Sequence, residues 1–510
     1  MLCLSVCSRT LKRFPKQKVK SLKSSVCVIR CKMQAAILGD ENIAEIEGIH
    51  YESNSLTWLH KCAPAFPIDG SKVTIFHEPA KFYAALLEKC RNSKKRITLA
   101  SLYIGTGEME KELINSIKKS IESNCGNIKV TILLDYMRGS RGKVNSRNML
   151  KTLLKGEVGN HCNVFLYHTP RLRGLLKALI PDRFNELIGL QHMKLYVIDD
   201  TLIISGANLS NDYFSNRQDR YFMFEDCKEL CDFYCDLVNR VSEFSFQLNS
   251  DGTDYWNENS FHPVESSNDV FVSEASDKVR SLFLKEINKR SDLHKQDLKE
   301  DTWVFPLVQM GQLNIRHDSQ ITLQLLKTAQ AGSVLRLATG YFNLTTNYKE
   351  AIIDSCRAEC HLLTAHPEAN GFFRAKGVAG GIPAAYSKIE NSFFELCKKF
   401  KQDQRIKLWE FMKPGWTYHA KGLWYSMPGQ QKPSLTLIGS PNFGYRSVER
   451  DLETQVALLT TNKNLQDSLQ KEYEHLFNSA EVVTSSTFQQ KERIPPAWVR
   501  VAVLLFRYYF

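Results

Sequence analysis

Acidic residues are missing from the start of this 510-residue chain, where Asp40 is the first one. Residues 1–33 contain nine Lys or Arg and five Ser, without the unbroken apolar run of a secretory signal. This composition is typical of a mitochondrial transit peptide, which we expect over residues 1–35, with a linker over residues 36–70. The alternative interpretation is a disordered basic arm that contacts a membrane or nucleic acid.

Long apolar runs and paired cysteines are also missing. No uninterrupted apolar stretch reaches the ~18 residues that a membrane span needs, so we expect a soluble or peripheral protein. The fourteen cysteines stand alone or at helical spacing, as in Cys227, Cys231 and Cys235. Structural zinc sites favour C-x2-C clusters with histidine, so we expect reduced, mostly buried thiols, no metal site and no cofactor.

The excess of positive charge is concentrated in the N-terminal segment. The formal net charge is +12, and subtracting the nine cations of residues 1–33 leaves +3 for the rest. An acidic partner is implied, such as a phosphorylated metabolite, an anionic membrane surface or nucleic acid. A nearly neutral body argues against the continuous basic groove of a nuclease, so we expect no nucleic-acid partner.

The pattern of strands and helices predicts an α/β protein in two halves. Strands are expected over 73–76, 96–104 and 127–135, with helices over 80–92 and 108–123 between them, which indicates parallel pairing in an α/β sandwich. We expect a first half over 71–249, a linker or surface insertion over the polar stretch 250–300, a second half over 301–480, and a C-terminal tail over 481–510.

The second half repeats the first. Residues 337–342 (Leu-Ala-Thr-Gly-Tyr-Phe) resemble residues 99–104 (Leu-Ala-Ser-Leu-Tyr-Ile), and each segment is followed by a helix and a short apolar strand. A His-x-Lys motif follows 93 residues after Leu99 in one copy and 82 residues after Leu337 in the other. These motifs, at His192 and His419, indicate an internal duplication.

Each His-x-Lys motif has polar companions. Residues two apart on a strand share a face, so Lys194 lies beside His192 and Lys421 beside His419. Asp199, which we include among the catalytic candidates, follows the first motif. The turn that comes next has an amide at Asn208 or, in the second copy, at Asn442 after Ser440. Small residues and an amide in such a turn can hold phosphate oxygens. A carboxylate then opens another apolar strand in each copy, Asp219 in the first and Glu453 in the second.

The twice-repeated pattern H-x-K-x4-D with G-S-x-N resembles the phospholipase D superfamily over most of residues 70–480. That resemblance implies two similar α/β sandwich halves packed around one shared active site. Four shorter segments (138–142, 168–170, 206–210 and 376–380) resemble a phosphatidyl-transferring branch of the superfamily from eukaryotic mitochondria. This branch implies transfer from CDP-diacylglycerol to glycerol 3-phosphate with release of CMP, on the way to phosphatidylglycerol and cardiolipin.

Two histidines suffice for such an exchange without a metal. One neutral imidazole attacks phosphorus and the other, protonated, donates to the leaving oxygen. We predict His192 as the nucleophile and His419 as the acid and base, although the reverse order stays open. The two motif lysines and two asparagines would stabilise the transition state. We expect Asp219 to orient His192 and Glu453 to orient His419.

The second copy departs from the pattern. Ser426 stands where the motif has an acidic residue, and residues 427–434 lengthen the following turn. In the first copy the small pair reads Ser205-Gly206 instead of Gly-Ser. If the motif Asp braces its loop, the difference affects only loop geometry; if it takes part in protonation, the second site is impaired. We favour the first interpretation because Glu453 is available to His419.

Further candidates concern substrate and membrane. We expect Arg138 and Arg141, at the end of the strand over 127–135, to bind an anionic acceptor. Gly105 and Gly107 form a weak nucleotide-loop candidate, since the Lys-Ser/Thr ending of a P-loop is missing. Residues 172–180 form a short basic amphipathic helix, and residues 498–510 are rich in aromatics. Each could contact an anionic membrane, or could be an ordinary surface helix and a closing core element, respectively.

Two other functions stay open on the sequence. The same His-Lys pairs attack any phosphodiester, so a lipid-hydrolysing phospholipase D or a nuclease is the main alternative. A catalytically silent scaffold is the other, because Ser426 replaces a motif residue.

Overall fold

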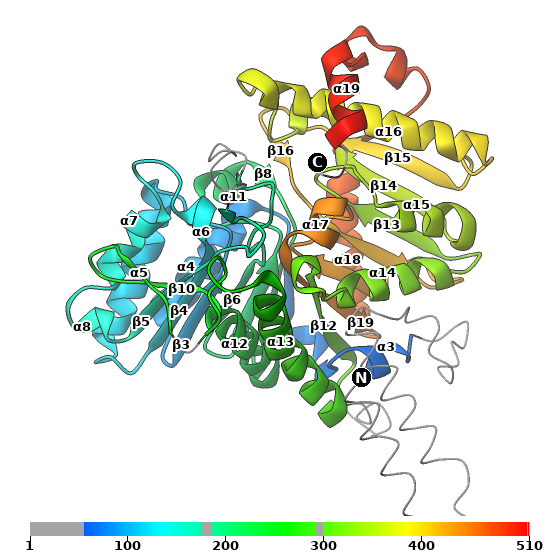
Figure 1. The fold of residues 1–510 in the computed structure, drawn as a ribbon. Helices are drawn as coiled ribbons and strands as arrows, with labels where there is room; N and C mark the ends of the chain where they lie inside the picture. The colour runs from blue at the N-terminus through cyan, green and yellow to red at the C-terminus, as the bar shows by residue number, and fades with distance from the viewer. Residues whose placement is uncertain (1–55, 175–184, 259, 291–298, 507, 509–510) are drawn as a thin grey trace, which may run out of the picture.

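The computed structural model describes residues 56–174, 185–258, 260–290, 299–506 and 508 (Figure 1). The predicted transit peptide over residues 1–35, most of the predicted linker over 36–70 and most of the predicted amphipathic helix over 172–180 lie outside these ranges. Within them, no helix is both long and apolar enough to cross a bilayer. The ten described cysteines are free thiols, and all except Cys125 are buried.

Two nine-stranded sheets form the framework. The first has the order β11 (Asp254–Tyr255), β10 (Phe246–Leu248), β5 (Cys162–Tyr167), β4 (Lys129–Asp135), β3 (Arg96–Ala100), β6 (Leu195–Ile198), β7 (Thr201–Ser205), β9 (Tyr221–Phe224) and β2 (Val73–Phe76). The second has the order β1 (Phe66–Ile68), β12 (Thr302–Met310), β19 (Leu452–Thr460), β18 (Leu435–Gly439), β17 (Gly422–Ser426), β13 (Val334–Ala338), β14 (Glu359–Ala365), β15 (Ile406–Phe411) and β20 (Ala480–Val482). Read in opposite directions, the sheets match strand for strand from β2 and β12 to β10 and β20, as the predicted duplication requires.

The sheets are mixed, not parallel as the strand–helix alternation suggested. Strands β3, β4 and β5 run parallel, and so do β13, β14 and β15. The strands that follow the His-x-Lys motifs, β6 and β17, run antiparallel to β3 and β13. Both motif strands are central, and every residue of each is buried because the faces of the sheet are covered.

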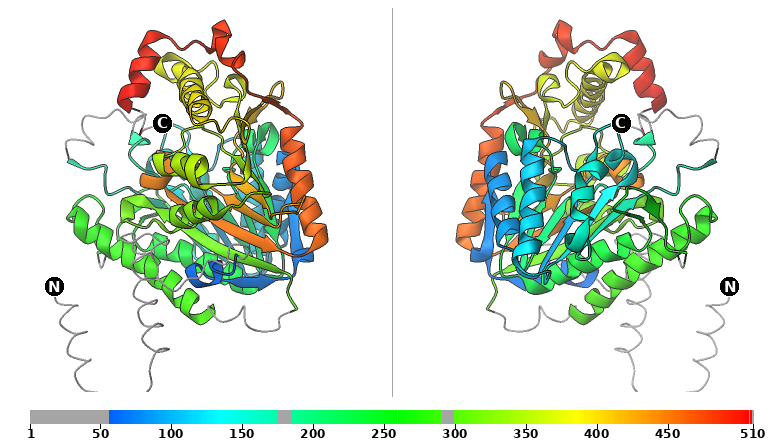
Figure 2. Two further views of the ribbon diagram at one scale, coloured as in Figure 1. Left: turned by 90° about the vertical axis from the view of Figure 1, so that its right-hand side faces the viewer. Right: turned by 90° about the vertical axis from the view of Figure 1, so that its left-hand side faces the viewer.

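Helices cover the outer faces of the sheets and fill the space between them (Figure 2). They are α3 (Leu59–Cys62), α4 (Pro79–Asn92), α5 (Glu108–Ser123), α6 (Tyr136–Gly139), α7 (Ser146–Leu150), α8 (Gly156–Gly159), α11 (Asn211–Ser215), α12 (Lys228–Ser242), α13 (Asn268–Arg290), α14 (His317–Thr328), α15 (Thr346–Glu350), α16 (Ile382–Lys399), α17 (Tyr445–Glu449), α18 (Lys463–Phe477) and α19 (Ala497–Phe506). In α5, apolar residues recur on one face (Leu113, Ile114, Ile117 and Ile121) and are buried against the first sheet.

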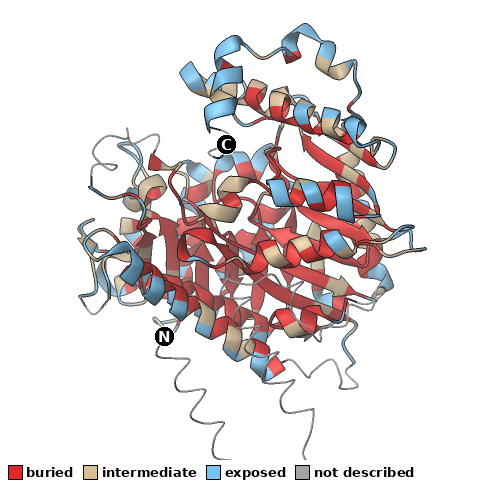
Figure 3. Cartoon of the chain, turned by 45° about the vertical axis from the view of Figure 1, so that its right-hand side comes forward, coloured by how far each residue is buried: buried red, intermediate tan, exposed pale blue. Residues whose placement is uncertain are grey.

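One apolar core joins the halves. It contains Val197 and Phe222 from the first sheet, Val308 and Val456 from the second, and residues of the helices α12, α13 and α18. Figure 3 shows this buried interior running continuously from one sheet to the other. The halves are therefore held face to face by shared apolar packing.

Part of the stretch 250–300 packs into the core, so this part is not a surface insertion. It contains α13, whose apolar residues (Phe271, Ala275, Val279, Leu282 and Phe283) recur every three or four positions and are buried in the shared core. The polar residues between them face outward, which is why the average composition indicated a linker. Residues 56–68, also expected to be a linker, instead pack into the second half, where β1 pairs with β12.

Arg220 ties the first half to the second. Its buried guanidinium lies 3.8 Å from the centre of the Trp424 ring and donates to both carboxylate oxygens of Glu472 on α18. It also donates to the Leu437 carbonyl oxygen at 2.7 Å. A bidentate, fully buried pair of this kind fixes orientation as well as contact.

Candidate active site

The two His-x-Lys motifs lie just before β6 and β17, not inside the strands. Lys194 Nζ donates to the carbonyl oxygen of His192 at 2.7 Å, and Lys421 Nζ donates to that of His419 at the same distance. Both lysines are completely buried. The structure therefore holds each lysine beside its histidine, as the two-residue spacing predicted.

Gly422 makes the second motif possible. Its φ is +119°, and a Cβ atom would lie 2.1 Å from the Leu437 carbonyl oxygen and 2.4 Å from Arg220 Nη1. A side chain would collide with both, so glycine is required where the chain passes from Lys421 into β17.

Each motif is held by the opposite half. The His192 amide donates to the Leu452 carbonyl at 2.8 Å, and the His419 amide donates to the Gln218 carbonyl at 2.8 Å. Around the second contact, β8 (Arg217–Gln218) and β16 (Thr417–Tyr418) form a two-stranded parallel sheet. Around the first, Gln191 forms a bridge with Leu452.

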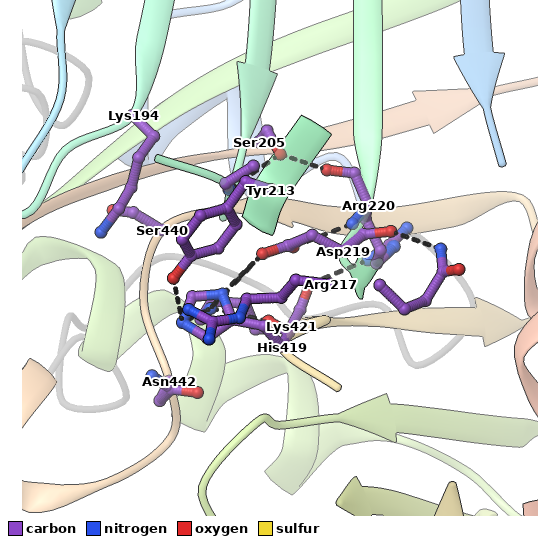
Figure 4. Close-up of polar contacts among 12 residues, drawn as sticks. Lys194, Ser205, Tyr213, Arg217, Asp219, Arg220, His419, Lys421, Ser440 and Asn442 are labelled. Atoms are coloured by element: carbon purple, nitrogen blue, oxygen red, sulfur yellow. Dashed lines mark hydrogen bonds and ion pairs between the residues drawn. The ribbon is translucent and has the colours of Figure 1, made fainter. Parts of the chain in front are cut away.

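Each histidine is consequently paired with the carboxylate of the other half. His192 Nδ1 lies 2.9 Å from Glu453 Oε1, and His419 Nδ1 lies 2.6 Å from Asp219 Oδ2. The expectation that Asp219 serves His192 and Glu453 serves His419 is wrong, because the residue before each carboxylate binds the histidine of the other half. Figure 4 shows Asp219 and Tyr213, both from the first half, converging on His419 of the second.

Burial governs the protonation of the histidines. Loss of water lowers the pKa of His192 and of His419 well below the usual value, and the nearby lysines lower it further. Both rings are therefore neutral at neutral pH. We assign the proton to Nδ1, facing the carboxylate, which leaves a lone pair on Nε2. A charge on His192 also lowers the pKa of His419, so the two rings belong to one site.

The lysines and carboxylates titrate in an unusual range as well. Burial lowers the pKa of Lys421 to about 8, against the opposing pull of Asp219 and Glu453. Burial lowers the pKa of Lys194 well below its ordinary value. It raises the pKa of Asp219 to about 6, and it also raises that of Glu453. Groups with shifted pKa values gathered in one place are typical of catalytic sites.

The asparagine and serine side chains in the turns after β7 and β18 differ in their hydrogen bonds. Asn208 is buried, and its side-chain oxygen has no hydrogen-bond partner among the described residues. The Asn442 oxygen accepts from Thr339 Oγ1 at 3.2 Å. The Ser440 hydroxyl, by contrast, bonds to the backbone of Thr454, as Ser205 bonds to the Arg220 carbonyl in the first half. Ser440 thus joins two strands, and the side-chain amides of Asn208 and Asn442 are the groups suited to bind a ligand.

Asp199 lies away from the chemistry. It occupies the hairpin turn at the far end of β6, with φ +51°. Its carboxylate accepts from the backbone amides of Lys94, Lys95 and Arg96 at 2.7–3.1 Å. The assignment of Asp199 as catalytic is wrong, and it braces the loop instead. At the corresponding turn, Ser426 Oγ donates to the Gln431 carbonyl, so the departure from the motif does not touch the reacting groups.

The remaining candidates for substrate binding differ in the protein groups that they contact. The Arg138 guanidinium lies 4.2 Å from the centre of the Tyr103 ring. Arg141 instead pairs with Glu186 at 3.0 Å. The loop around Gly105 and Gly107 is filled by Glu110, because a Cβ at either glycine would lie within 3 Å of that carboxylate. A carboxylate in this position repels phosphate, so we do not retain the nucleotide loop.

Sequence reasoning missed three residues beside His419. Tyr213 OH lies 3.3 Å from His419 Nε2, and the Arg217 guanidinium lies 4.7 Å from the centre of the Tyr213 ring. Tyr341 packs edge-on against the His419 ring at 6.0 Å. Two signals could have found them: Arg217 precedes Asp219 by two residues, and Tyr341 is the fifth residue of the repeated segment 337–342.

One group of possible metal ligands exists among the described residues. The ligand atoms of His192, Asp451 and Glu453 lie within 4.8 Å of one another. His192 and Glu453 share a hydrogen bond, and Asp451 accepts from the Leu190 amide and from Arg446 Nε. Because these groups already bind each other and their neighbours, we assign no metal to them.

A solved structure shares this fold. The chain superimposes on a phosphatidylserine synthase from Haemophilus influenzae with a TM-score of 0.67 and 19% identity, over 88% of this chain and 95% of the other. The two repeated α/β halves, which bring two His-x-Lys motifs into one buried site, confirm the fold that the resemblance implied.

Comparison with curated relatives identifies the family of this chain. A human mitochondrial CDP-diacylglycerol–glycerol-3-phosphate 3-phosphatidyltransferase is 42% identical over 488 residues, which cover 91% of this chain and 87% of the relative. A Saccharomyces cerevisiae protein named as the same transferase is 34% identical over 86% of this chain and 88% of its own length. No family model matches the chain. The chain belongs to the family of CDP-diacylglycerol–glycerol-3-phosphate 3-phosphatidyltransferases.

Proposed function

We propose that the protein transfers a phosphatidyl group from CDP-diacylglycerol to sn-glycerol 3-phosphate, giving phosphatidylglycerophosphate and CMP. Full-length relatives with this activity in their names support the reaction. The observation that carries the mechanism is the crossed pair of neutral, carboxylate-held histidines in one buried site. The human relative is named as mitochondrial, in agreement with the predicted transit peptide, and we place the protein at the periphery of the inner membrane.

The first chemical step forms a covalent intermediate. His192 Nε2, which makes no hydrogen bond to any described residue, attacks the phosphorus next to diacylglycerol. The N–P bond forms as the P–O bond to CMP breaks, and His419 gives its proton to CMP. The negative diphosphate raises the pKa of His419 when it binds, so this ring can carry the proton. Lys194, Lys421 and the two motif asparagines stabilise the transition-state oxygens.

The second step reverses the roles around phosphorus. His419 takes the proton of a glycerol 3-phosphate hydroxyl, and the oxygen attacks the phosphatidyl-histidine. The O–P bond forms, the N–P bond breaks, and His192 returns to the neutral state. Asp219 and Glu453 keep both Nε2 atoms aimed at phosphorus and stabilise the charged form of each ring, as the carboxylate of a catalytic triad does.

A radiochemical assay tests the function. Purified protein, CDP-diacylglycerol in mixed micelles and labelled glycerol 3-phosphate should give labelled phosphatidylglycerophosphate, with one CMP per product. CMP release by water without the acceptor would instead support the alternative, a phosphodiesterase of the phospholipase D or nuclease type. No turnover by intact protein with confirmed lipid presentation would support the silent scaffold.

The pH dependence should be bell-shaped. We expect kcat/KM to decrease at pH values below about 6, where Asp219 becomes protonated and no longer accepts from His419. It should also decrease at pH values above about 8, where Lys421 loses its charge. The measurement is a pH profile at saturating acceptor. In the Lys421→Arg variant the alkaline limb of the profile should move to higher pH, because arginine stays charged. An alkaline limb that does not move in an active Lys421→Arg protein would exclude Lys421 as its source.

Arg217 is our candidate for the phosphate of the acceptor. Its guanidinium lies 4.7 Å from the centre of the Tyr213 ring, whose hydroxyl lies 3.3 Å from Nε2 of the proposed base His419. Its ion pair with Asp212 is 3.4 Å long and the Asp212 side chain is 60% exposed, so the pairing is weak. Arg138, stacked on Tyr103, is a second candidate.

Arg217→Met should raise KM for glycerol 3-phosphate by roughly 10- to 100-fold, which is the cost of one charge-assisted hydrogen bond. KM for CDP-diacylglycerol should change much less. Arg141→Met is the matched control, because Arg141 pairs with Glu186 and should leave both constants unchanged. An equal rise in both KM values for Arg217→Met would mean a general structural effect.

A further inference from the structure

The C-terminal helix α19 exposes an apolar surface. It has ten residues and none of them is charged except Arg500. Only Val499 is buried, while Leu504 is 81% exposed, Leu505 63% and Val501 56%. Val501, Leu504 and Leu505 are three and four residues apart, so these exposed side chains share one side of the helix. Large contiguous apolar surface on a folded protein marks a place of contact.

The helix is fixed to the second half. Arg493, just before α19, is buried and forms a bidentate pair with Glu410 of β15. Trp498 packs so closely on Gly381, at the start of α16, that a Cβ there would lie 2.1 Å from the indole ring. Val499 completes the inner side. The inner side of α19 thus has its contacts already, and the exposed side points away from the protein.

The segment before α16 extends this surface. Phe373 is 39% exposed and Val378 69%, and Arg374 and Lys376 between them are also exposed. The segment lies next to α19 because it leads through η8 (Gly377–Gly381) to the contact with Trp498. We call the exposed residues of 373–378 and of α19 the C-terminal face.

The charge of the C-terminal face has one sign. Residues 369–381 and 493–510 contain no Asp or Glu. Exposed cations within them are Arg374, Lys376 and Arg500. A surface that combines apolar side chains with cations only is complementary to anionic phospholipid, where apolar burial and electrostatic attraction add.

The C-terminal face also adjoins the active site. Tyr508, just after α19, packs edge-on against Tyr445 at 4.7 Å, and Tyr445 begins α17 three residues after Asn442. Two residues before the face, a Cβ atom at Gly371 would lie 3.5 Å from the Tyr341 hydroxyl and 3.6 Å from Arg217 Nη2.

We propose that the C-terminal face docks the enzyme on an anionic phospholipid bilayer, with the active site on the side of the protein next to the membrane. This inference rests on the proposed function, in which the donor substrate has two acyl chains and resides in a bilayer. Docking on this side of the protein allows the CDP headgroup to reach the histidines while the acyl chains stay near the lipid phase.

The test compares Leu504→Gln/Leu505→Gln with wild type. Sedimentation with vesicles of phosphatidylcholine and about 30 mol % phosphatidylserine should show roughly tenfold or greater loss of binding in the variant, and weaker wild-type binding at high salt. Phe400→Gln is the matched control, because Phe400 is 49% exposed at the end of α16, outside the C-terminal face. It should bind like wild type.

Activity separates this proposal from the proposed function. The double variant should lose activity on vesicle-embedded CDP-diacylglycerol to the same extent as binding, and keep wild-type activity on a short-chain, water-soluble CDP-diacylglycerol. Equal vesicle binding by variant and wild type would overturn the docking proposal. A wild-type dimer in light scattering that is lost in the variant, without vesicle binding, would overturn it in favour of an interface between two copies. Lack of activity on the soluble substrate in wild type would count against the function itself.

Discussion

His419→Asn protein mixed with CDP-diacylglycerol should release about one equivalent of CMP, more slowly than wild type, and then stop. His192 can still form the phosphatidyl adduct because CMP, a phosphate leaving group, can depart without the proton of His419, but no base remains to activate the acceptor. His192→Asn should release none, and both variants should lose about 10⁴-fold or more of steady-state turnover. Rapid-quench measurement of CMP and mass spectrometry of the adduct on His192 check this result.

The reverse outcome is equally informative. A burst in His192→Asn with the adduct on His419 would exchange the two roles. Steady turnover in either variant without an adduct would indicate direct displacement by the acceptor. Thermal unfolding of both variants is the control, since both rings are largely buried and a misfolded protein would also lack a burst.

The second large effect concerns the crossed carboxylates. In the His419→Asn background the burst reports on His192 alone. Adding Glu453→Gln should slow the burst by about 10²-fold or more, because the amide lacks the negative charge that fixes the tautomer of the His192 ring. Adding Asp219→Asn should change the burst rate by only a few-fold, since Asp219 binds the ring that is already absent.

The comparison is matched, because both carboxylates are completely buried in the same site and both substitutions remove one charge. A burst slowed more by Asp219→Asn than by Glu453→Gln would contradict the crossed pairing and restore the pairing within each half. Equal slowing would indicate that net charge, and not ring orientation, sets the rate.

Much of the fold could be predicted because the signals are local. Strand and helix periods along residues 71–135 indicated α/β structure, and the repeat of 99–104 at 337–342 indicated two halves. Strand direction could not be read this way, since a strand such as β6 has the same pattern in parallel and antiparallel pairing when both faces are buried. The helix α13 was missed because its buried positions are outnumbered by the polar residues between them.

The sequence by itself determined which groups the site contains: two histidines with their lysines on one face, two asparagines in turns, and two carboxylates that open later strands. Only the tertiary structure decided how they pair. Gln218 and Leu452 reach across to the histidine of the other half, and so Asp219 and Glu453 exchange partners. Residue spacing fixes which side of a strand a group faces, whereas contacts between groups some 200 positions apart depend on how the halves pack.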